Sequence, residues 1–274
     1  MARPANRLTR KTVAEDPRSF GPGMTNPFDL SANVAIVTGG NLGLGQAIAV
    51  ALAQAGADIV STSRRPADET CAKVEALGRR FLSIEADLGT TEPIPHIVAR
   101  TLSEFGRLDI LVNNAGIIRR ADSVDFTEED WDAVIDTNLK SAFFLAQAAG
   151  RRMIAQGRGK IINIASMLSF QGGIRVPSYT ASKSGIAGVT RLLACEWASK
   201  GVNVNAIAPG YMSTDNTAAL RSDEKRNAQI LDRIPAGRWG EPSDLGGAAV
   251  FLASRASDYV HGAIIPVDGG WLAR

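Results

Sequence analysis

The sequence predicts a single α/β domain in which a doubly wound, seven-stranded parallel sheet carries helices on both faces. Short β-branched runs alternate with longer Ala-rich segments, and neither a Pro/Ser-rich linker nor an internal repeat interrupts the series. Continuous apolar runs are typical of strands buried on both faces, and strict alternation with helices indicates right-handed βαβ units. With 274 residues, the chain is long enough to bury one sizeable core.

The β-branched runs place the strands, and the Ala-rich segments place helices between them. The strands are expected at residues 34–38, 58–62, 81–85, 110–113, 160–164, 203–207 and 264–267. The helical segments include residues 45–55, 93–105, 128–155, 178–198 and 242–253. Residues 1–27 have no apolar periodicity and carry five basic and two acidic side chains. We therefore expect a flexible basic extension over residues 1–27 and the domain over residues 28–274.

Composition excludes several classes of protein. No apolar run approaches the roughly 20 residues that a membrane span needs. Two Cys and two His are too few for a disulfide framework or a zinc cluster, so no metal site is expected. A net charge of +2 gives no strong attraction to nucleic acid or anionic lipid. We expect a cytoplasmic protein with a small-molecule partner, and neither nucleic acid nor membrane as a partner.

The turn after the first strand is rich in glycine. Its sequence is Thr38-Gly39-Gly40-Asn41-Leu42-Gly43-Leu44-Gly45. Glycines here let the backbone approach a pyrophosphate, which then lies against the positive end of the following helix. The G-x-x-x-G-x-G spacing differs from the general G-x-G-x-x-G fingerprint, and a tight turn alone would also use glycines. The position in the first βαβ unit favours a dinucleotide. The candidate contacts are Gly39, Asn41, Leu42, Gly43 and Gly45.

The ends of the next strands bear on the choice of dinucleotide. After the second strand the sequence Ser61-Thr62-Ser63-Arg64-Arg65 offers no carboxylate for the ribose 2′-hydroxyl of NAD. Arg64 favours the 2′-phosphate of NADP, although a solvated surface charge and use of NAD remain open. Asp87 and Leu88 are expected beside the adenine, and Asn114, Ala115 and Gly116 beneath the cofactor.

Tyr179 and Lys183 are four residues apart on an expected helix, so they share one face. A phenol with a pKa near 10 is a poor base, but an ammonium within about 4 to 6 Å lowers that pKa, as does an oxidised nicotinamide. A shift of about three units needs roughly 4 kcal/mol. We expect Lys183 to lower the pKa of Tyr179, which then exchanges a proton as hydride moves. A surface Tyr/Lys pair is the ordinary alternative.

Two further polar residues converge on the same crevice. Ser166 ends the fifth strand, and ligands of open α/β sheets bind beyond the carboxyl ends of the strands. Its hydroxyl is therefore expected to bind the substrate oxygen. Asn138 is expected to anchor a water that links Lys183 to solvent.

On these residues the chain resembles the short-chain dehydrogenase/reductase family over residues 30–274. The shared motifs are Thr38-Gly39 with Gly43 and Gly45, Asn113-Asn114-Ala115-Gly116, Asn138, Ser166, Tyr179 with Lys183, and Pro209-Gly210. The resemblance implies a Rossmann fold with Tyr179 as general acid/base, Lys183 on the nicotinamide ribose, Ser166 on the substrate carbonyl and Asn138 in a proton relay. It also implies nicotinamide contact by Pro209 and Gly210, and a mobile substrate lid over about residues 211–230.

A narrower set of stretches, residues 113–121, 161–173, 233–242 and 267–272, resembles family members that oxidise a secondary alcohol of a short sugar acid. Those members mostly use NAD, which leaves the dinucleotide open between NAD and NADP. The carboxylate of a sugar acid calls for a fixed cation. The candidates are Arg119, Arg120 and Arg175, each of which is otherwise a solvated loop arginine.

Other functions remain open at this point. The alternatives are another reductase of the family, acting on gluconate or on a 3-oxoacyl group held by a carrier protein, and a nucleotide-sensing regulator. A regulator would be expected to lack Ser166, Tyr179 or Lys183, and all three are present. Family members commonly pair two helices across subunits, so apolar residues of segments 128–155 and 178–198 predict a homotetramer, with core packing as the alternative. These residues are Phe143, Phe144, Leu192, Leu193 and Trp197.

Overall fold

A seven-stranded, all-parallel sheet in the order β3-β2-β1-β4-β5-β6-β7 forms the centre of the protein, as the sequence predicts. The computed structural model describes residues 26–274, so the extension expected over residues 1–27 lies, up to residue 25, outside the described residues. The strands are β1 (Val34–Thr38), β2 (Asp58–Ser63), β3 (Phe81–Glu85), β4 (Ile110–Asn113), β5 (Gly159–Ile164), β6 (Val202–Pro209) and β7 (Ile264–Val267).

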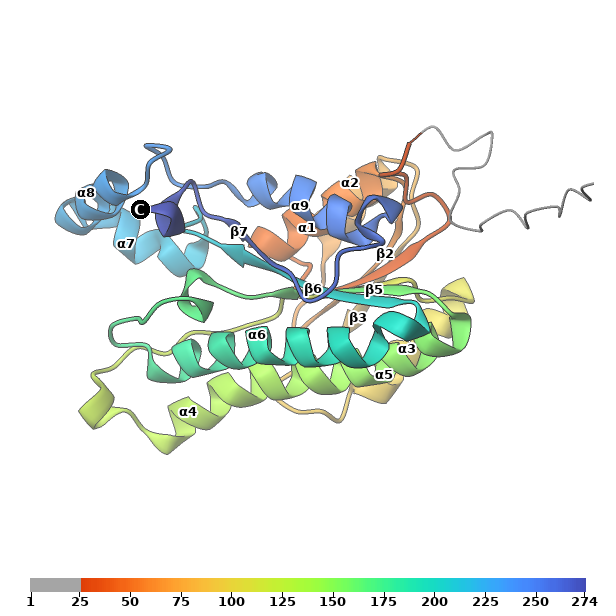
Figure 1. The fold of residues 1–274 in the computed structure, drawn as a ribbon, viewed down its shortest axis with the longest axis horizontal. Coiled ribbons are helices and arrows are strands. Elements are labelled where there is room, and N and C mark those ends of the chain that lie inside the picture. The colour runs from red at the N-terminus through yellow and green to blue at the C-terminus, as the bar shows by residue number, and fades with distance from the viewer. Residues whose placement is uncertain (1–25) are drawn as a thin grey trace, which may run out of the picture.

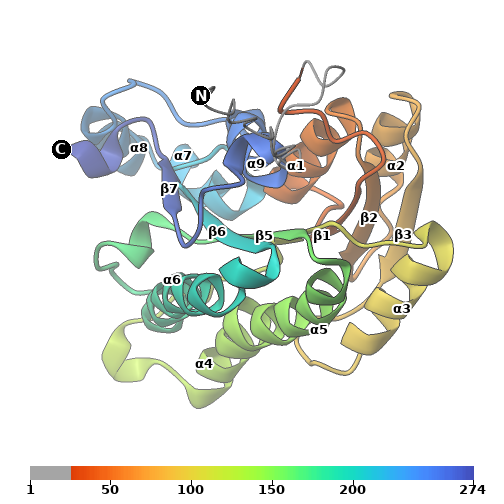
Figure 2. The ribbon, with the colours of Figure 1, turned by 45° about the vertical axis from the view of Figure 1, so that its right-hand side comes forward.

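Helices cover both faces of the sheet (Figures 1 and 2). One face packs against α3 (Ile94–Phe105), α5 (Ser141–Gln156) and α6 (Pro177–Trp197), and α4 (Glu128–Ile135) lies beside α6. The other face packs against α1 (Gly43–Gln54) and α9 (Gly246–Ala253), and α2 (Asp68–Glu75) lies beside α1. The short helices α7 (Ala218–Ser222) and α8 (Glu224–Arg233) lie near the C-terminus at one end of the molecule.

The strand β1 illustrates why its residues form a buried strand. Its side chains alternate between faces: Val34 and Ile36 join the core on the α3 and α5 side, whereas Ala35 and Val37 join the core on the α1 and α9 side. A strand covered on both faces needs apolar residues at every position, which is why its sequence shows no polar alternation.

The segment expected over residues 128–155 is helical throughout, but it is not a single α-helix. A five-residue π-helical segment, Asp136–Lys140, separates α4 from α5, and the Ser141 N–H donates to the carbonyl of Asp136 five residues back. Such segments insert one extra residue per turn and occur often at functional sites. Here the segment contains Asn138, whose side chain binds the backbone of Ile117 beyond the helix.

The order of the strands in the sheet determines where the ligand-binding crevice lies. The chain runs from β1 outward to β2 and β3, then returns to β4 on the other side of β1. The two halves of the sheet therefore diverge at the carboxyl ends of β1 and β4, which is where doubly wound sheets bind ligands. Within the described part of the chain, no helix combines the length and apolar character that crossing a bilayer requires.

Candidate active site

The glycine turn forms an open cradle at the start of α1. Gly43 has a φ of +56°, which favours glycine, and a Cβ placed there would meet only a methyl group of Thr214 at 4.0 Å. At Gly45 a Cβ would collide with the carbonyl of Gly39 and with Asn114, so only glycine allows this close packing. Leu42, at the N-cap, supplies no side-chain acceptor, and the first turn of α1 contains no acidic residue.

This cradle fits a dinucleotide. The N–H groups of the first helical turn lack side-chain caps, and the space beside Gly43 is open enough for a phosphate, whereas the contact of Asn41 with the cofactor stays a prediction. Backbone donors at a helix N-terminus are the groups that bind a pyrophosphate.

Thr38 joins the cradle to the turn that follows β4. Its Oγ1 accepts hydrogen bonds from the backbone N–H groups of Asn114 (2.9 Å) and Ala115 (2.8 Å). The Asn114 amide donates to the Thr38 carbonyl at 2.8 Å. Gly116 follows, and a Cβ there would come within 3.2 Å of Asn138 Oδ1. These bonds fix the floor expected beneath the cofactor.

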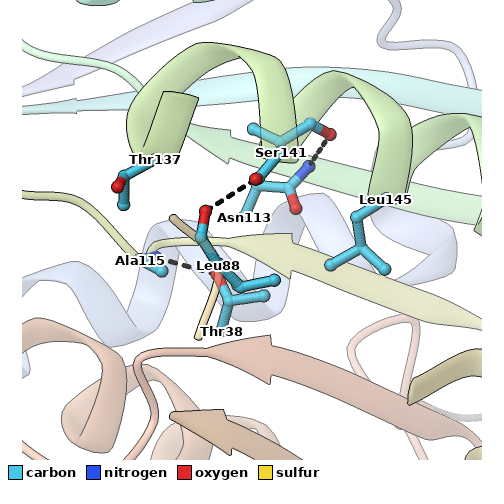
Figure 3. A pocket seen from close by; sticks show the side chains of 8 residues that line it. Thr38, Leu88, Asn113, Ala115, Thr137, Ser141 and Leu145 are labelled. Carbon is cyan, nitrogen blue, oxygen red and sulfur yellow. Dashed lines mark hydrogen bonds between the residues drawn. The ribbon is translucent and has the colours of Figure 1, made fainter. Parts of the chain in front are cut away.

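Asn113 faces the interior instead of the crevice. Its Nδ2 donates to the carbonyl of Ala142 (3.1 Å) and to Asn163 Oδ1 (2.9 Å), which ties β4 to α5 and β5. A small pocket beside it is drawn in Figure 3, where Ser141 Oγ donates to the carbonyl of Leu88 at 2.6 Å. Leu88 is 7% exposed and belongs to the core cluster on this side of the sheet, and its contact with the adenine stays a prediction.

The ends of β2 and β3 present the groups expected near the adenosine. Arg64 is exposed, and no carboxylate lies in the stretch from residue 61 to residue 65. Asp87 is exposed and accepts a hydrogen bond from the Gly89 N–H at 2.9 Å. The hydroxyls of Ser61 and Thr62 are buried without a hydrogen-bond partner within residues 26–274.

Ser166, Tyr179 and Lys183 meet at the carboxyl end of β5. The Lys183 side chain is 5% exposed; its Nζ donates to the carbonyl of Ile164 at 2.6 Å and lies 5.6 Å from the centre of the Tyr179 ring. Ser166 Oγ accepts from the Leu168 N–H at 3.2 Å and lies close enough to the Tyr179 side chain to lower its pKa. The three side chains that the sequence singles out are therefore brought together.

The expected effect of Lys183 on the phenol is not seen in the structure. Burial raises the pKa of Tyr179, and the Ser166 hydrogen bond and the charge of Arg120 lower it by less. Burial also lowers the pKa of Lys183, to about 8. The net pKa of Tyr179 is therefore raised in the protein without a cofactor, because desolvation outweighs the neighbouring charges, and the lowering effect of Lys183 stays a prediction.

Asn138 is 3% exposed and locked by three hydrogen bonds. Its Oδ1 accepts from the Ile117 N–H at 2.8 Å, and its Nδ2 donates to the Ile117 carbonyl (2.9 Å) and to Ser182 Oγ (3.3 Å). Ser182 in turn donates to the carbonyl of Tyr179 at 2.8 Å. The side chain thus joins the β4 turn to α6, and its part in a proton relay stays a prediction.

Two of the three candidate arginines have carboxylate partners. Arg119 Nε lies 3.0 Å from Asp130 Oδ1, and Arg175 Nε lies 3.0 Å from Asp122 Oδ1. An arginine already paired with a carboxylate is a weaker anchor for a second one, because the partner must be displaced.

Arg120 differs from the other two. It has no carboxylate partner within residues 26–274; its Nη2 donates to the carbonyl of Asn216 at 3.4 Å. Its positive charge also lowers the pKa of Tyr179, which places it on the side of the reacting hydroxyl. The structure thus separates three arginines that the sequence leaves equivalent.

The segment expected as a lid contains α7 and α8 and follows Pro209 and Gly210 at the end of β6. The Gly210 N–H donates to the carbonyl of Val267 at 3.0 Å, and a Cβ at Gly210 would come within 2.5 Å of the Asp268 Cα. Thr214 lies over Gly43, so this segment reaches the glycine cradle.

Several residues that shape the site have no signal in the sequence. Thr38 stands in the glycine motif, but nothing in the motif indicates its double hydrogen bond to the β4 turn. Asp122 and Asp130 decide which arginine stays unpaired, and only the fold brings them together with Arg175 and Arg119.

Comparison with known proteins identifies the family. A family model described as Enoyl-(Acyl carrier protein) reductase matches residues 39–272. The 2-dehydro-3-deoxy-D-gluconate 5-dehydrogenase of Escherichia coli (strain K12) is 65% identical over 248 residues, which cover 90% of this chain and 98% of that protein. The protein of the same name from Dickeya dadantii (strain 3937) is 61% identical over 250 residues, covering 91% and 99%.

A solved structure is similar to this chain over nearly the same residues. A protein from Agrobacterium tumefaciens, described as a 2-deoxy-D-gluconate 3-dehydrogenase with bound NADP, is 60% identical, with a TM-score of 0.86 and coverage of 91% of this chain and 100% of that one. These relatives confirm the narrower resemblance read from the sequence. The chain belongs to the short-chain dehydrogenase/reductase family.

Proposed function

We propose that this protein is an NADP-dependent oxidoreductase that interconverts a secondary alcohol and a ketone on a sugar acid, with 2-dehydro-3-deoxy-D-gluconate as the substrate. The observation that carries the proposal is the position of the Tyr179 side chain, whose pKa Ser166 lowers and whose ring centre lies 5.6 Å from the Nζ of buried Lys183, at the crevice that the glycine cradle opens. The names of the 65% and 61% identical relatives support the substrate.

Each side chain has a distinct part in this chemistry. A nicotinamide held by the glycine cradle would supply the acceptor or the donor of the hydride that the reacting carbon exchanges. Ser166 donates a hydrogen bond to the reacting oxygen and holds it beside the phenol. Tyr179 gives a proton to that oxygen during ketone reduction and removes it during alcohol oxidation. Lys183 holds the ribose of the cofactor and, while charged, favours the phenolate. Asn138 fixes the β4 turn and supports a water path to Lys183.

The preference for NADP rests on the end of β2. An exposed arginine, Arg64, with no nearby carboxylate suits a 2′-phosphate and offers nothing to a free 2′-hydroxyl. The NADP bound in the 60% identical structure supports the same choice.

The test of the function is a panel of sugar acids assayed separately with NADP and NAD. We expect reduced nicotinamide to form with 2-dehydro-3-deoxy-D-gluconate, with a higher kcat/KM for NADP than for NAD. Activity that is restricted to gluconate or to acyl thioesters would refute the substrate, and equal or better use of NAD would refute the role of Arg64.

Replacing Arg120 by Ala is expected to raise the KM for the sugar acid about tenfold to hundredfold, because a charge-assisted hydrogen bond to the carboxylate is lost. The KM for a neutral polyol should change little. Arg119→Ala and Arg175→Ala are matched controls, since their guanidinium groups are paired with Asp130 and Asp122. An equal loss on acid and polyol, or a larger effect in either control, would contradict the assignment.

We also propose a homotetramer. Leu193 and Trp197 are buried within the subunit, but Trp131, Phe144 and Leu192 on α4, α5 and α6 are 41%, 40% and 51% exposed. Light scattering is expected to give four times the subunit mass, and Leu192→Lys is expected to reduce it. A monomeric unsubstituted protein would refute this.

We also propose a location in the cytoplasm, which the free thiols of Cys71 and Cys195 support.

A further inference from the structure

A polar side chain near the catalytic serine is held by the C-terminal segment of the chain. Gln171 lies five residues after Ser166, in a loop that folds back tightly: the N–H groups of Phe170 and Gln171 both donate to the carbonyl of Met167, at 2.9 and 3.1 Å. The Trp271 Nε1 donates to Gln171 Oε1 at 3.3 Å. A residue close to the end of the chain is thereby tied to the loop beside the reacting groups.

The indole fixes which end of the amide is available. An indole N–H only donates, so the amide atom that it meets must be the oxygen. The NH₂ end of Gln171 then points elsewhere. It has no hydrogen-bond partner within residues 26–274, and it is not among the side-chain atoms that are buried there without a partner, so it keeps access to solvent.

The anchor for this amide is rigid. Trp271 is 5% exposed, its ring meets Tyr211 edge-on with centres 4.8 Å apart, and the Arg233 guanidinium lies 4.1 Å from its ring centre. Asp268 accepts hydrogen bonds from the N–H groups of Gly270 and Leu272, both at 2.9 Å, which hold the turn that carries the indole.

The loop itself is also fixed against α6. Ser169 Oγ donates to the carbonyl of Lys183 at 2.5 Å, and Ser184 Oγ donates to the carbonyl of Leu168 at 3.2 Å. Lys183 is one turn beyond Tyr179. Gln171 is therefore held between the helix that carries the catalytic tyrosine and the C-terminal Trp271, and the indole fixes the orientation of its amide.

From this geometry we infer that Gln171 is a specificity-determining residue that donates a hydrogen bond to the terminal hydroxyl of the sugar acid, and that Trp271 is the positioning residue for its amide. The inference rests on the proposed function. The relatives act at carbon 5 by name, so the terminal hydroxyl is one carbon from the reacting centre, whereas the carboxylate is four carbons away. We assign the nearby terminal hydroxyl to Gln171, which is tied closely to Ser166, and the more distant carboxylate to Arg120.

The experiment compares the sugar acid with the analogue in which a methyl group replaces the terminal CH₂OH. In Gln171→Leu and in Gln171→Glu, which still accepts the indole N–H but has no NH₂, we expect the KM for the sugar acid to rise at least about tenfold. The KM for the analogue should stay within about twofold, kcat should change little on either substrate, and the Kd for NADP should be unchanged.

Substitutions of the two indoles separate positioning from packing. Trp271→Phe keeps a ring but frees the amide, so it should raise the KM for the sugar acid by less than Gln171→Glu does. Trp239→Phe is the matched control, because its indole belongs to the same aromatic cluster but donates to Asn227 Oδ1 at 2.7 Å. We expect no change in that variant.

Two results would overturn the inference: an equal rise in KM on both substrates in Gln171→Glu, or no rise on either. If the unsubstituted protein turned over no sugar acid, the proposed function would fail and this inference with it. That failure is recognised in the unsubstituted protein, before any variant is compared.

Discussion

Substituting Tyr179 by Phe is expected to lower kcat by about a hundredfold to ten-thousandfold in both directions, which is the range that general acid–base catalysis contributes. The change deletes one hydroxyl and keeps the ring, so packing in the crevice and the glycine cradle are retained. The Kd for NADP should therefore be unchanged. Steady-state rates and a fluorescence titration with NADP, carried out on the same preparation, test both parts.

The chain offers a matched control for this substitution. Tyr259 is 99% exposed and lies far along the chain from the crevice residues, so Tyr259→Phe makes the same chemical change where no chemistry is expected. It should leave kcat unaltered. Tyr179→Phe with a kcat within a few-fold of the unsubstituted protein would remove Tyr179 from the reaction.

Lys183→Met is expected to lower kcat/KM for alcohol oxidation by about a hundredfold and to change the shape of its pH profile. Burial raises the pKa of Tyr179, so the phenol is protonated at neutral pH, which suits ketone reduction; alcohol oxidation should accelerate as pH rises and the phenol loses its proton. Lys183, with a pKa of about 8, is charged below that pH and loses its charge above it.

The favourable effect of the ammonium on the phenolate is therefore complete below about pH 8 and fades above it. In the unsubstituted protein the rise of oxidation with pH should flatten near that value. The Met variant should lose this inflection, whereas Lys200→Met, at an exposed site beyond α6, should retain it. An inflection near pH 8 that survives in Lys183→Met would belong to another group.

The strands were the most predictable part of the fold. Four of them, β1, β3, β4 and β7, have the predicted bounds. β1 and β4 are buried along their whole length, and a run of apolar residues marks such a strand. The π-helical segment was not predictable from local pattern, and its residue Asn138 is hydrogen-bonded to Ile117, which lies 21 residues away in the chain. Segments α7 and α8 are short and polar, and local pattern does not reveal how they pack.

The site was predictable where chemistry depends on spacing within one element. Tyr179 and Lys183 share a face because four residues make about one helical turn. The direction of the Tyr179 pKa was not predictable in this way, because burial depends on what the rest of the fold places around the ring. The same holds for Arg120, which is distinguished from Arg119 and Arg175 only by the carboxylates that the fold supplies to the other two.

The most direct measurement of the central claim is a single turnover. Protein loaded with NADPH is mixed with the 5-keto form of the sugar acid, and the fluorescence of the reduced nicotinamide is followed. We predict a rapid loss of fluorescence in the unsubstituted protein, and a loss slowed at least about a hundredfold in Tyr179→Phe that holds the same amount of NADPH. Equal rates in the two proteins, or no bound NADPH in either, would contradict proton transfer by Tyr179 beside a bound nicotinamide.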